Sequence, residues 1–466
     1  MIERRRLLSV SGGLAATALA GCTDILGGED VPFDGDPTEW PQTLHDPGNT
    51  GRNPAASGPR DGLEREWVYE PDPDIEGFFE SYSAPIVREG DVYIAERWRM
   101  RTDDEHADHA YLVALDESGE PRWTEELGVE SGVPLTKFGL LVHGDDVVTV
   151  SAFTPSGRIA GPGGTTLFEG SRYDPATGEH SETFELDELA GPTTLADERL
   201  YAFDSGGVMT VDPADGVVDE RFAYEPTDDE LVAPFGDSVG YPPTVVEGTV
   251  YAAATSRLVA AEPGTDEPEW VLDVDDVPEL VGADMAGTFF QPAVGTDRLY
   301  AVYGVWNAPW MESDTPESDP EVLGGVVTVD RESGEVEWTW QPDVEDDWAG
   351  TFGCSPVVDG DRIYVTGYHG LNAGDEPDQR LYALDAEGSG QVWDRSIAEQ
   401  AYAPVASNET VYVATPNEVV AIDASSGDRL ARDTLEEYSP DPEVPPAVVD
   451  GRLVVATQSA VIAYGE

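Results

Sequence analysis

Two closely spaced histidines are the first residues to test for chemistry. His106 and His109 have the H-x-x-H spacing of a metal-binding pair. A zinc site needs further ligands on a rigid element, whereas these histidines lie in a polar, acidic segment that we expect to be a solvated loop. The pair therefore predicts no metal site, and we identify no catalytic residue.

An acidic stretch resembles the opening of a calcium-binding loop. Asp72, Asp74 and Glu76 precede Gly77 in the spacing of an EF-hand. The twelfth position of that loop is Ser83, where a bidentate glutamate is required. We expect these carboxylates to reflect the acidity of the chain, and we assign no metal ligands.

The two cysteines, Cys22 and Cys354, lie far apart in the sequence. One belongs to the N-terminal leader, so the mature fold has no disulfide framework. Cys354 lies next to the start of a predicted strand, and no neighbouring group would lower the pKa of its thiol. We expect it to be buried and inert.

Aromatic side chains form the strongest candidate site. They fall in long, variable connections between predicted strands, and aromatic anchors give large contact areas at low rotamer cost. The alternative is that they pack the connections against one another, and the sequence leaves both open. The candidate binding rim comprises Trp98, Trp306, Trp310, Trp348, Phe78, Phe79, Tyr368 and His369.

A repeated pattern supplies the elements that would position these residues. Each copy has a proline, a short apolar strand, a Gly/Asp turn, a strand often ending in tyrosine, a strand ending in aspartate, and a last strand carrying tryptophan. Copies recur about every 52 residues, a period typical of propeller blades. The strand-opening prolines are Pro85, Pro192, Pro243, Pro292, Pro356, Pro404 and Pro446, and a copy without proline starts near Leu141.

The last copy lacks its fourth strand, and the N-terminus supplies a candidate. Residues 66–72 (EWVYEPD) match residues 337–343 (EWTWQPD) but have no copy before them. Closing a ring removes open sheet edges. We therefore predict an all-β, eight-bladed propeller of four-stranded antiparallel blades over residues 39–466, with a lead-in at 39–62 and a closing strand at 63–71.

The connections between strands differ in length on the two faces of such a ring. Those joining strands one to two and three to four are short turns. Those joining strands two to three, or one blade to the next, share the opposite face, where we expect partner binding. The long ones are 97–110, 154–166, 303–324 and 368–379, and between blades 72–83, 225–241, 274–290 and 343–354.

The N-terminus carries an export leader. Arg4 and Arg5, followed by Arg6-Leu7-Leu8, resemble a twin-arginine signal, and the apolar stretch that follows is too short to span a bilayer. Residues 19–22 (LAGC) resemble a lipobox, so we predict a signal peptide at 1–21, lipidation of Cys22 and an acidic tether at 22–38. The alternative is a plain signal peptide with an incidental cysteine.

The charge is extreme. Asp and Glu number 94 against 25 Lys and Arg, a net charge of −69. At 1 M salt the Debye length is about 3 Å, so crowded carboxylates hardly repel each other. We expect a protein adapted to concentrated salt, whose stability rises with salt. This acidic balance leaves no basic patch to release counterions, which argues against nucleic acid as a partner.

Two repeat segments carry a family resemblance. Residues 381–393 (LYALDAEGSGQVW) and 326–338 (VVTVDRESGEVEW) resemble the repeat of pyrroloquinoline-quinone-type (PQQ) propellers. That family includes quinoprotein alcohol dehydrogenases and outer-membrane assembly lipoproteins, and residues 40–59 look like the lead-in of haloarchaeal members. The resemblance implies PQQ and calcium as possible cofactors. The dehydrogenases carry an adjacent-cysteine disulfide, which this chain lacks, so we expect neither cofactor.

Together these features favour a non-catalytic binding or scaffold propeller, lipid-anchored on the outer face of the cell membrane, with an unknown surface protein or polymer as partner. Two alternatives remain. The first is a PQQ- or metal-dependent oxidoreductase. The second is an extracellular polymer-processing enzyme that uses paired carboxylates.

Overall fold

A computed structural model gives the architecture. It describes residues 36–72, 75, 77–101, 106–127, 135–153, 167–186, 193–203, 207–213, 218–223, 242–254, 257–277, 287–305, 322–343, 349–351, 355–369, 378–388, 390–397, 404–435, 438 and 444–466. Nearly all regular structure in this part is β-strand, apart from one short 3-10 helix, η1 (Val274–Asp276).

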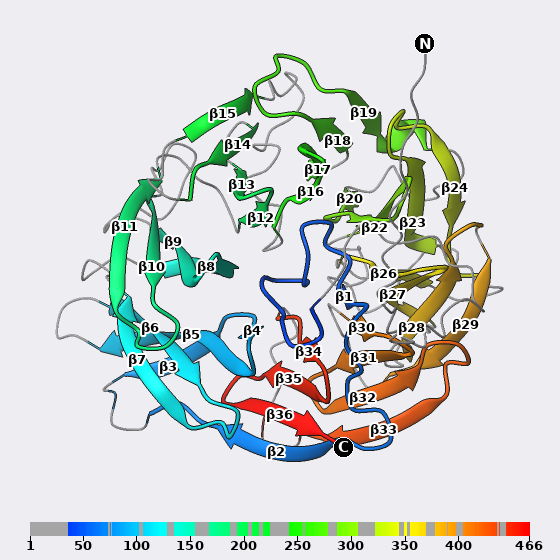
Figure 1. Ribbon diagram of the computed structural model, residues 1–466. Coiled ribbons are helices and arrows are strands. Elements are labelled where there is room, and N and C mark those ends of the chain that lie inside the picture. Colours follow the sequence, from blue (N-terminus) through cyan, green and yellow to red (C-terminus); the bar gives the residue numbers. More distant parts are fainter. Residues whose placement is uncertain are drawn as a thin grey trace, which may run out of the picture.

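Eight four-stranded antiparallel blades form a ring, which confirms the predicted propeller (Figure 1). Blade 1 is β4 (Ile86–Arg88), β5 (Asp91–Arg101), β6 (His106–Leu115) and β7 (Pro121–Leu127). Blade 2 is β8 (Leu135–His143), β9 (Asp146–Phe153), β10 (Leu167–Tyr173) and β11 (His180–Leu186). Blade 3 is β12 (Thr194–Ala196), β13 (Arg199–Phe203), β14 (Gly207–Val211) and β15 (Val218–Ala223). Blade 4 is β16 (Thr244–Val246), β17 (Thr249–Ala254), β18 (Arg257–Ala261) and β19 (Trp270–Asp273).

The other half of the ring repeats this plan. Blade 5 is β21 (Ala293–Val294), β22 (Arg298–Val305), β23 (Val322–Asp330) and β24 (Val336–Trp340). Blade 6 is β26 (Val357–Asp359), β27 (Arg362–His369), β28 (Asp378–Asp385) and β29 (Gln391–Ser396). Blade 7 is β30 (Val405–Ser407), β31 (Thr410–Ala414), β32 (Glu418–Asp423) and β33 (Arg429–Thr434). Blade 8 is β34 (Ala447–Val449), β35 (Arg452–Ala456), β36 (Val461–Gly465) and the N-terminal β2 (Glu64–Tyr69).

The ring closes where the two ends of the chain meet. β2 pairs antiparallel with β36, from Glu64 opposite Gly465 to Tyr69 opposite Val461. In Figure 1 the blue β2 lies beside the red β36. The predicted closing strand is therefore confirmed.

The ring has two unlike faces. The turn face carries the short turns between the first and second, and the third and fourth, strands of each blade. The hairpin face carries the turns between the second and third strands, which differ in height. β5 and β6 have 11 and 10 residues, whereas β35 and β36 have 5 each. At about 3.3 Å per residue, the longest hairpin rises roughly 15–20 Å above the shortest.

The tall hairpins follow a pattern around the ring. Central strands of blades 1, 2, 5 and 6 have seven or more residues, and those of blades 3, 4, 7 and 8 have five or six. Two tall pairs therefore stand opposite each other. The segment 97–110, which we expected to be a loop, is mostly strand because β5 and β6 stay paired as far as Arg101 and His106.

Three added strands brace the tall hairpins. β3 (Phe78–Tyr82), β20 (Gly287–Phe289) and β25 (Ala349–Thr351) pair with the extended ends of β5, β22 and β27. β25 also pairs in parallel with β23, which links blades 5 and 6 into one sheet.

A tryptophan of one blade packs over a glycine turn of the next blade, a contact that we call the tryptophan seat. Trp393 of blade 6 covers Gly427 of blade 7, and its indole N–H donates to the carbonyl of Ala424 at 3.0 Å. Asp423 shapes that turn by accepting hydrogen bonds from Ser425 and Ser426, which hold the pKa of its carboxyl below the usual value. The same seating recurs at Trp67 on Gly119, Trp123 on Gly178 and Trp270 on Gly334.

The lead-in runs around the inside of the ring. The first strand of each blade lies next to the axis, and one of its edges has no neighbouring strand within the blade. Residues 40–53 supply partners to these edges in blade order (Figure 1). The peptide N–H groups of five inner strands donate to this segment: Val87 to Trp40, Val142 to Pro41, Val245 to Pro47, Val294 to Gly48 and Val358 to Thr50. Ala406 of blade 7 donates to Gly51 beside the two-residue strand β1 (Arg52–Asn53).

No described segment forms a helix that could serve as a membrane span. The core instead consists of apolar layers between blades. One layer joins Tyr364 and Leu381 of blade 6 to Val411 and Val420 of blade 7, all nearly fully buried. Central strands are accordingly buried on both faces, as in β36, where every residue is buried.

The tryptophan seat predicts a difference between two glycine substitutions. Gly427 and Gly451 have nearly the same backbone angle, φ +71° and +74°, so alanine meets similar backbone strain at both. A Cβ at Gly427 would lie 2.6 Å from Trp393, whereas a Cβ at Gly451 would meet nothing within 4 Å. We expect Gly427→Ala to lower the free energy of unfolding by about 2 kcal/mol more than Gly451→Ala. Urea denaturation in molar salt measures this difference. Equal losses of unfolding free energy in the two variants would contradict the packing of Trp393 on Gly427.

Candidate functional site

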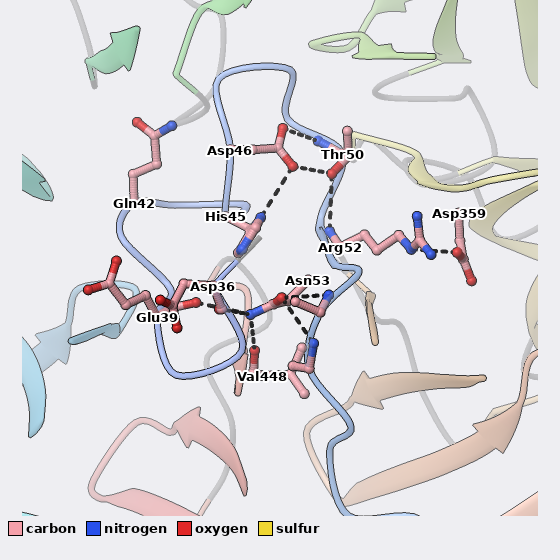
Figure 2. Close-up of polar contacts among 12 residues, drawn as sticks. Asp36, Glu39, Gln42, His45, Asp46, Thr50, Arg52, Asn53, Asp359 and Val448 are labelled. Atoms are coloured by element: carbon pink, nitrogen blue, oxygen red, sulfur yellow. Dashed lines mark hydrogen bonds and ion pairs between the residues drawn. The ribbon is translucent and has the colours of Figure 1, made fainter. Parts of the chain in front are cut away.

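The axis of the ring is occupied by a compact polar segment of the lead-in (Figure 2). Asp46 accepts hydrogen bonds from the backbone N–H of Thr50 at 3.2 Å, from the Thr50 hydroxyl, and from His45 Nδ1 at 3.4 Å. His45, Asp46 and Thr50 are at most 5% exposed. His45 also packs edge-on against Trp40, with ring centroids 5.0 Å apart. The segment is therefore a closed polar unit inside the ring.

Asn53 holds the two ends of this segment together. Its side-chain amide donates to the carbonyl oxygens of Asp36 at 2.9 Å and Glu39 at 3.0 Å, and at 3.5 Å to Val448 of blade 8. Its oxygen accepts from the N–H of Ala56 at 3.2 Å. One fully buried amide thereby closes the circuit that begins and ends at blade 8 (Figure 2).

The backbone of this segment is strained. Leu44, His45 and Asn49 have φ of 60°, 75° and 52°, in the left-handed region that non-glycine residues seldom adopt. Such residues cost of order 1–3 kcal/mol each and persist only where the surroundings impose them. Here the contacts to successive blades impose the path.

A buried ion pair adds a charge contact. Arg52 Nε lies 2.5 Å from Asp359 Oδ1 at the edge of blade 6, with both side chains less than one-fifth exposed. Burial raises the pKa of the Asp359 carboxyl, and the Arg52 guanidinium opposes that rise. The ion pair thereby ties this part of the lead-in to blade 6.

The lead-in places large side chains inside the ring. Trp40, Leu44, His45 and Asp46 are all nearly fully buried there. The described residues also contain no group of three or more His, Cys, Asp or Glu side chains arranged to hold a metal ion.

A second cluster lies at the junction of blades 8 and 1, at the base of the tallest hairpin. Glu96 of β5 is 1% exposed. Tyr69 of the closing strand donates its hydroxyl hydrogen to Glu96 Oε1 at 2.7 Å, and the Trp98 indole N–H donates to Oε2 at 2.9 Å. Phe79 packs against Trp98 and Tyr82, with centroids 5.5 and 4.5 Å apart. We call these five residues the seam cluster.

Burial controls the electrostatics of the seam cluster. Desolvation raises the pKa of Glu96, while the hydrogen bonds from Trp98 and Tyr69 oppose the rise. Desolvation also raises the pKa of Tyr69 and Tyr82, reinforced by the charge of Glu96. The buried carboxyl of Glu96 therefore ties the closing strand to blade 1 through its hydrogen bond with Tyr69.

The structure brings three predicted rim residues together in this region and places two others on blade 6. Trp98 and Phe79 belong to the seam cluster, with Trp98 only 5% exposed, whereas Phe78 beside them is 62% exposed. Tyr368 and His369 lie at the end of β27, where Tyr368 pairs with Gly350 and Gln379. Trp306, Trp310 and Trp348 lie outside the described residues.

The histidine pair is placed differently from our expectation. His109 lies in strand β6, not in a loop, and its Nδ1 lies 2.7 Å from Glu126 Oε1. His106 begins the same strand opposite Arg101. The structure therefore places both histidines in a strand and not in the solvated loop that we expected. Arg4, Arg5, Cys22, Cys354, Asp74 and Glu76 lie outside the described residues.

Sequence reasoning missed Glu96, Tyr69 and the axial segment. Residues 40–59 were noticed only as a lead-in, although their density of Asn, Asp, His and Gly signals a segment that satisfies backbone groups. Glu96 offered one signal, since it is a carboxylate at an apolar position of a strand reading DVYIAERW.

A family model and several solved structures are similar to this chain. The model of a family described as outer membrane protein assembly factor BamB matches residues 87–286 and 322–462. No curated protein matches the chain.

Several solved structures are similar at low identity. Sqt1 of Saccharomyces cerevisiae is 10% identical with a TM-score of 0.49, over 88% of this chain and 99% of that chain. The WD40 domain of Pan2 from Neurospora crassa is 9% identical with a TM-score of 0.39, over 72% and 89%. Apo AztD from Citrobacter koseri is 12% identical with a TM-score of 0.32, over 70% and 92%. We draw no functional argument from these three.

The seam cluster predicts a change in pH dependence. Because the pKa of Glu96 is higher in the folded state, its contribution to stability is complete below the unfolded pKa and is lost as the pH rises through the folded pKa. Glu96→Gln stays neutral, with an amide oxygen to accept from Trp98 and an amide group to donate to Tyr69. Thermal unfolding from pH 4 to 8 in molar salt should therefore show a smaller decline for this variant than for the parent chain.

Glu117→Gln, on an exposed turn of blade 1, is the matched control and should give a profile parallel to the parent. A decline as steep in Glu96→Gln as in the parent would show that Glu96 is not the buried acid at the seam.

Proposed function

Since the chain belongs to the family of outer membrane protein assembly factor BamB, we propose that it is a non-catalytic binding or scaffold propeller whose partner docks on the hairpin face. The family name describes an assembly factor, a role that depends on binding. A rigid ring that presents variable connections on one face is a common arrangement for recognition.

The proposal rests on the difference in strand and turn length between the two faces of the ring. The turn face has near-minimal turns, whereas the hairpin face carries strands of up to 11 residues braced by β3, β20 and β25. Ordering extra chain costs conformational entropy. A ring that served only as a spacer would gain nothing from extending one face, so the extended face is the one to which we assign the function.

The filled axis supports a role without an enclosed cofactor. A channel lined by all eight blades would suit a small ligand, but the lead-in contacts the inner strands there instead. In this proposal recognition takes place on the surface of the hairpin face, against an acidic background. It uses the exposed Phe78 and the rim tryptophans Trp306 and Trp310, and not the buried Trp98. Such a surface favours a cationic or polyhydroxylated partner over an anionic one.

The cellular location of the protein forms the second part of the proposal. The leader supports twin-arginine export through Arg4 and Arg5, and the lipobox supports lipid attachment at Cys22. The charge of −69 supports a working environment of concentrated salt. The ring would then stand on the outer side of the cell membrane, held by a tether at residues 22–38.

Substitution of two rim tryptophans tests the binding proposal. Trp306→Ala combined with Trp310→Ala should weaken capture of the partner roughly thirtyfold or more, because aromatic hot spots each contribute about 2 kcal/mol or more. Pull-down from native surface extracts in molar salt, with quantitative mass spectrometry, measures the loss. Asp361→Ala on the turn face is the control and should capture as the parent does. Retained capture by the double variant, or PQQ-dependent dye reduction by the parent protein, would refute the proposal.

Substitution of the lipobox cysteine tests the anchor. Cys22→Ser removes the thiol that would carry lipid, so the protein should appear in the medium or remain unprocessed. Fractionation of cells into membrane and medium, with the mature mass determined by mass spectrometry, measures this. A processed Cys22→Ser protein that stays in the membrane fraction would show that another feature holds it there.

A further inference from the structure

The described chain enters and leaves the ring on one face. The N–H of Asp450 donates to the carbonyl of Pro37 at 2.6 Å, and the N–H of Gly451 donates to that of Ser57 at 2.8 Å. Asp450 and Gly451 form the short turn between β34 and β35, which lies on the turn face. The lead-in therefore starts on the turn face, circles the axis and returns to it.

We infer that the ring is tethered by its turn face, so that the hairpin face is presented to partners away from the membrane. This rests on the proposed lipid anchor at Cys22. It goes further by assigning a side to each face and a class to the partner, namely a macromolecule that approaches from the aqueous side and not one embedded in the membrane.

The point where the tether begins is fixed. Asp36 caps the turn before Trp40 by accepting from the N–H and hydroxyl of Thr38 at 2.8 and 2.7 Å. The buried Asn53 holds the carbonyls of Asp36 and Glu39. Trp40 then forms an antiparallel bridge with Val87 of blade 1. A pull on the tether is therefore transmitted directly to the ring.

The two faces lie at different distances from the point where the tether joins the ring. Residues 22–36 could reach at most about 50 Å when fully extended. The tallest hairpin, with 11 residues in β5, adds about 35 Å of strand beyond the turn face. The turn face is therefore the nearer one to the attachment point by the length of the strands.

The charge of the turn face is compatible with a nearby membrane only in concentrated salt. Its turns carry carboxylates whose side chains are 62–106% exposed, namely Asp145, Glu247, Asp361, Glu387 and Glu409. The Debye length is about 8 Å at physiological salt but about 3 Å at 1 M. Molar salt therefore removes the repulsion from anionic headgroups beyond contact distance.

Energy transfer from two positions on a chemically anchored ring tests the orientation. The mature chain with Cys354→Ser is coupled through Cys22 to a maleimide lipid in vesicles at about 2 M salt. A donor dye is attached through an unnatural amino acid at Asp361 on the turn face or at Ser459 on the hairpin face, both exposed. Transfer to headgroup acceptors should be at least about twofold greater from position 361, because the faces differ in distance by the length of the strands.

Equal transfer from the two positions, or greater transfer from position 459, would overturn the inference. Uncoupled Cys22→Ser protein gives the background for both labels, and Cys354→Ala replaces Cys354→Ser if that variant does not fold. Chemical coupling separates this test from the proposed anchor. If cells leave Cys22 unmodified, the anchor fails while the transfer result still decides which face the tether holds.

Discussion

Eight inner strands each leave one edge of backbone groups facing the axis, and the structure depends on how those edges are satisfied. Buried peptide groups without partners are costly, and open edges invite pairing with other chains. Residues 40–53 meet this constraint by passing every blade in order, from the bridge of Trp40 with Val87 to the bonds of Asn53 near Val448. The strain at Leu44 and His45 is tolerated because these contacts fix the path from all sides.

The same solution bears on our functional proposal. Because the axis holds buried Trp40, His45 and Asp46, we propose that recognition takes place on a face of the ring. On the turn face, the lead-in enters the ring and the tryptophans pack between blades. The hairpin face is free to vary in height, and its tall ladders in blades 1, 2, 5 and 6 are the feature that our functional proposal uses.

Closure of the ring joins these two regions. β2 completes blade 8, while Tyr69 at its end bonds to the buried Glu96 of blade 1 and Trp67 covers Gly119 of the same blade. The N-terminal segment thus contributes twice, first inside the ring and then around its outer wall. Blade 8 cannot be completed by local folding, because its strands lie at opposite ends of the chain.

The sequence alone determined the blade number, the four-strand pattern and the closing strand, because the proline-to-tryptophan repeat and the match of residues 66–72 to 337–343 record local strand and turn preferences. It also identified the face with long connections. It did not reveal that residues 40–53 fill the axis, that Trp98 is buried, or that Glu96 lies between Tyr69 and Trp98. Those facts depend on contacts between residues tens to hundreds of positions apart, which the closed ring creates and no local pattern encodes.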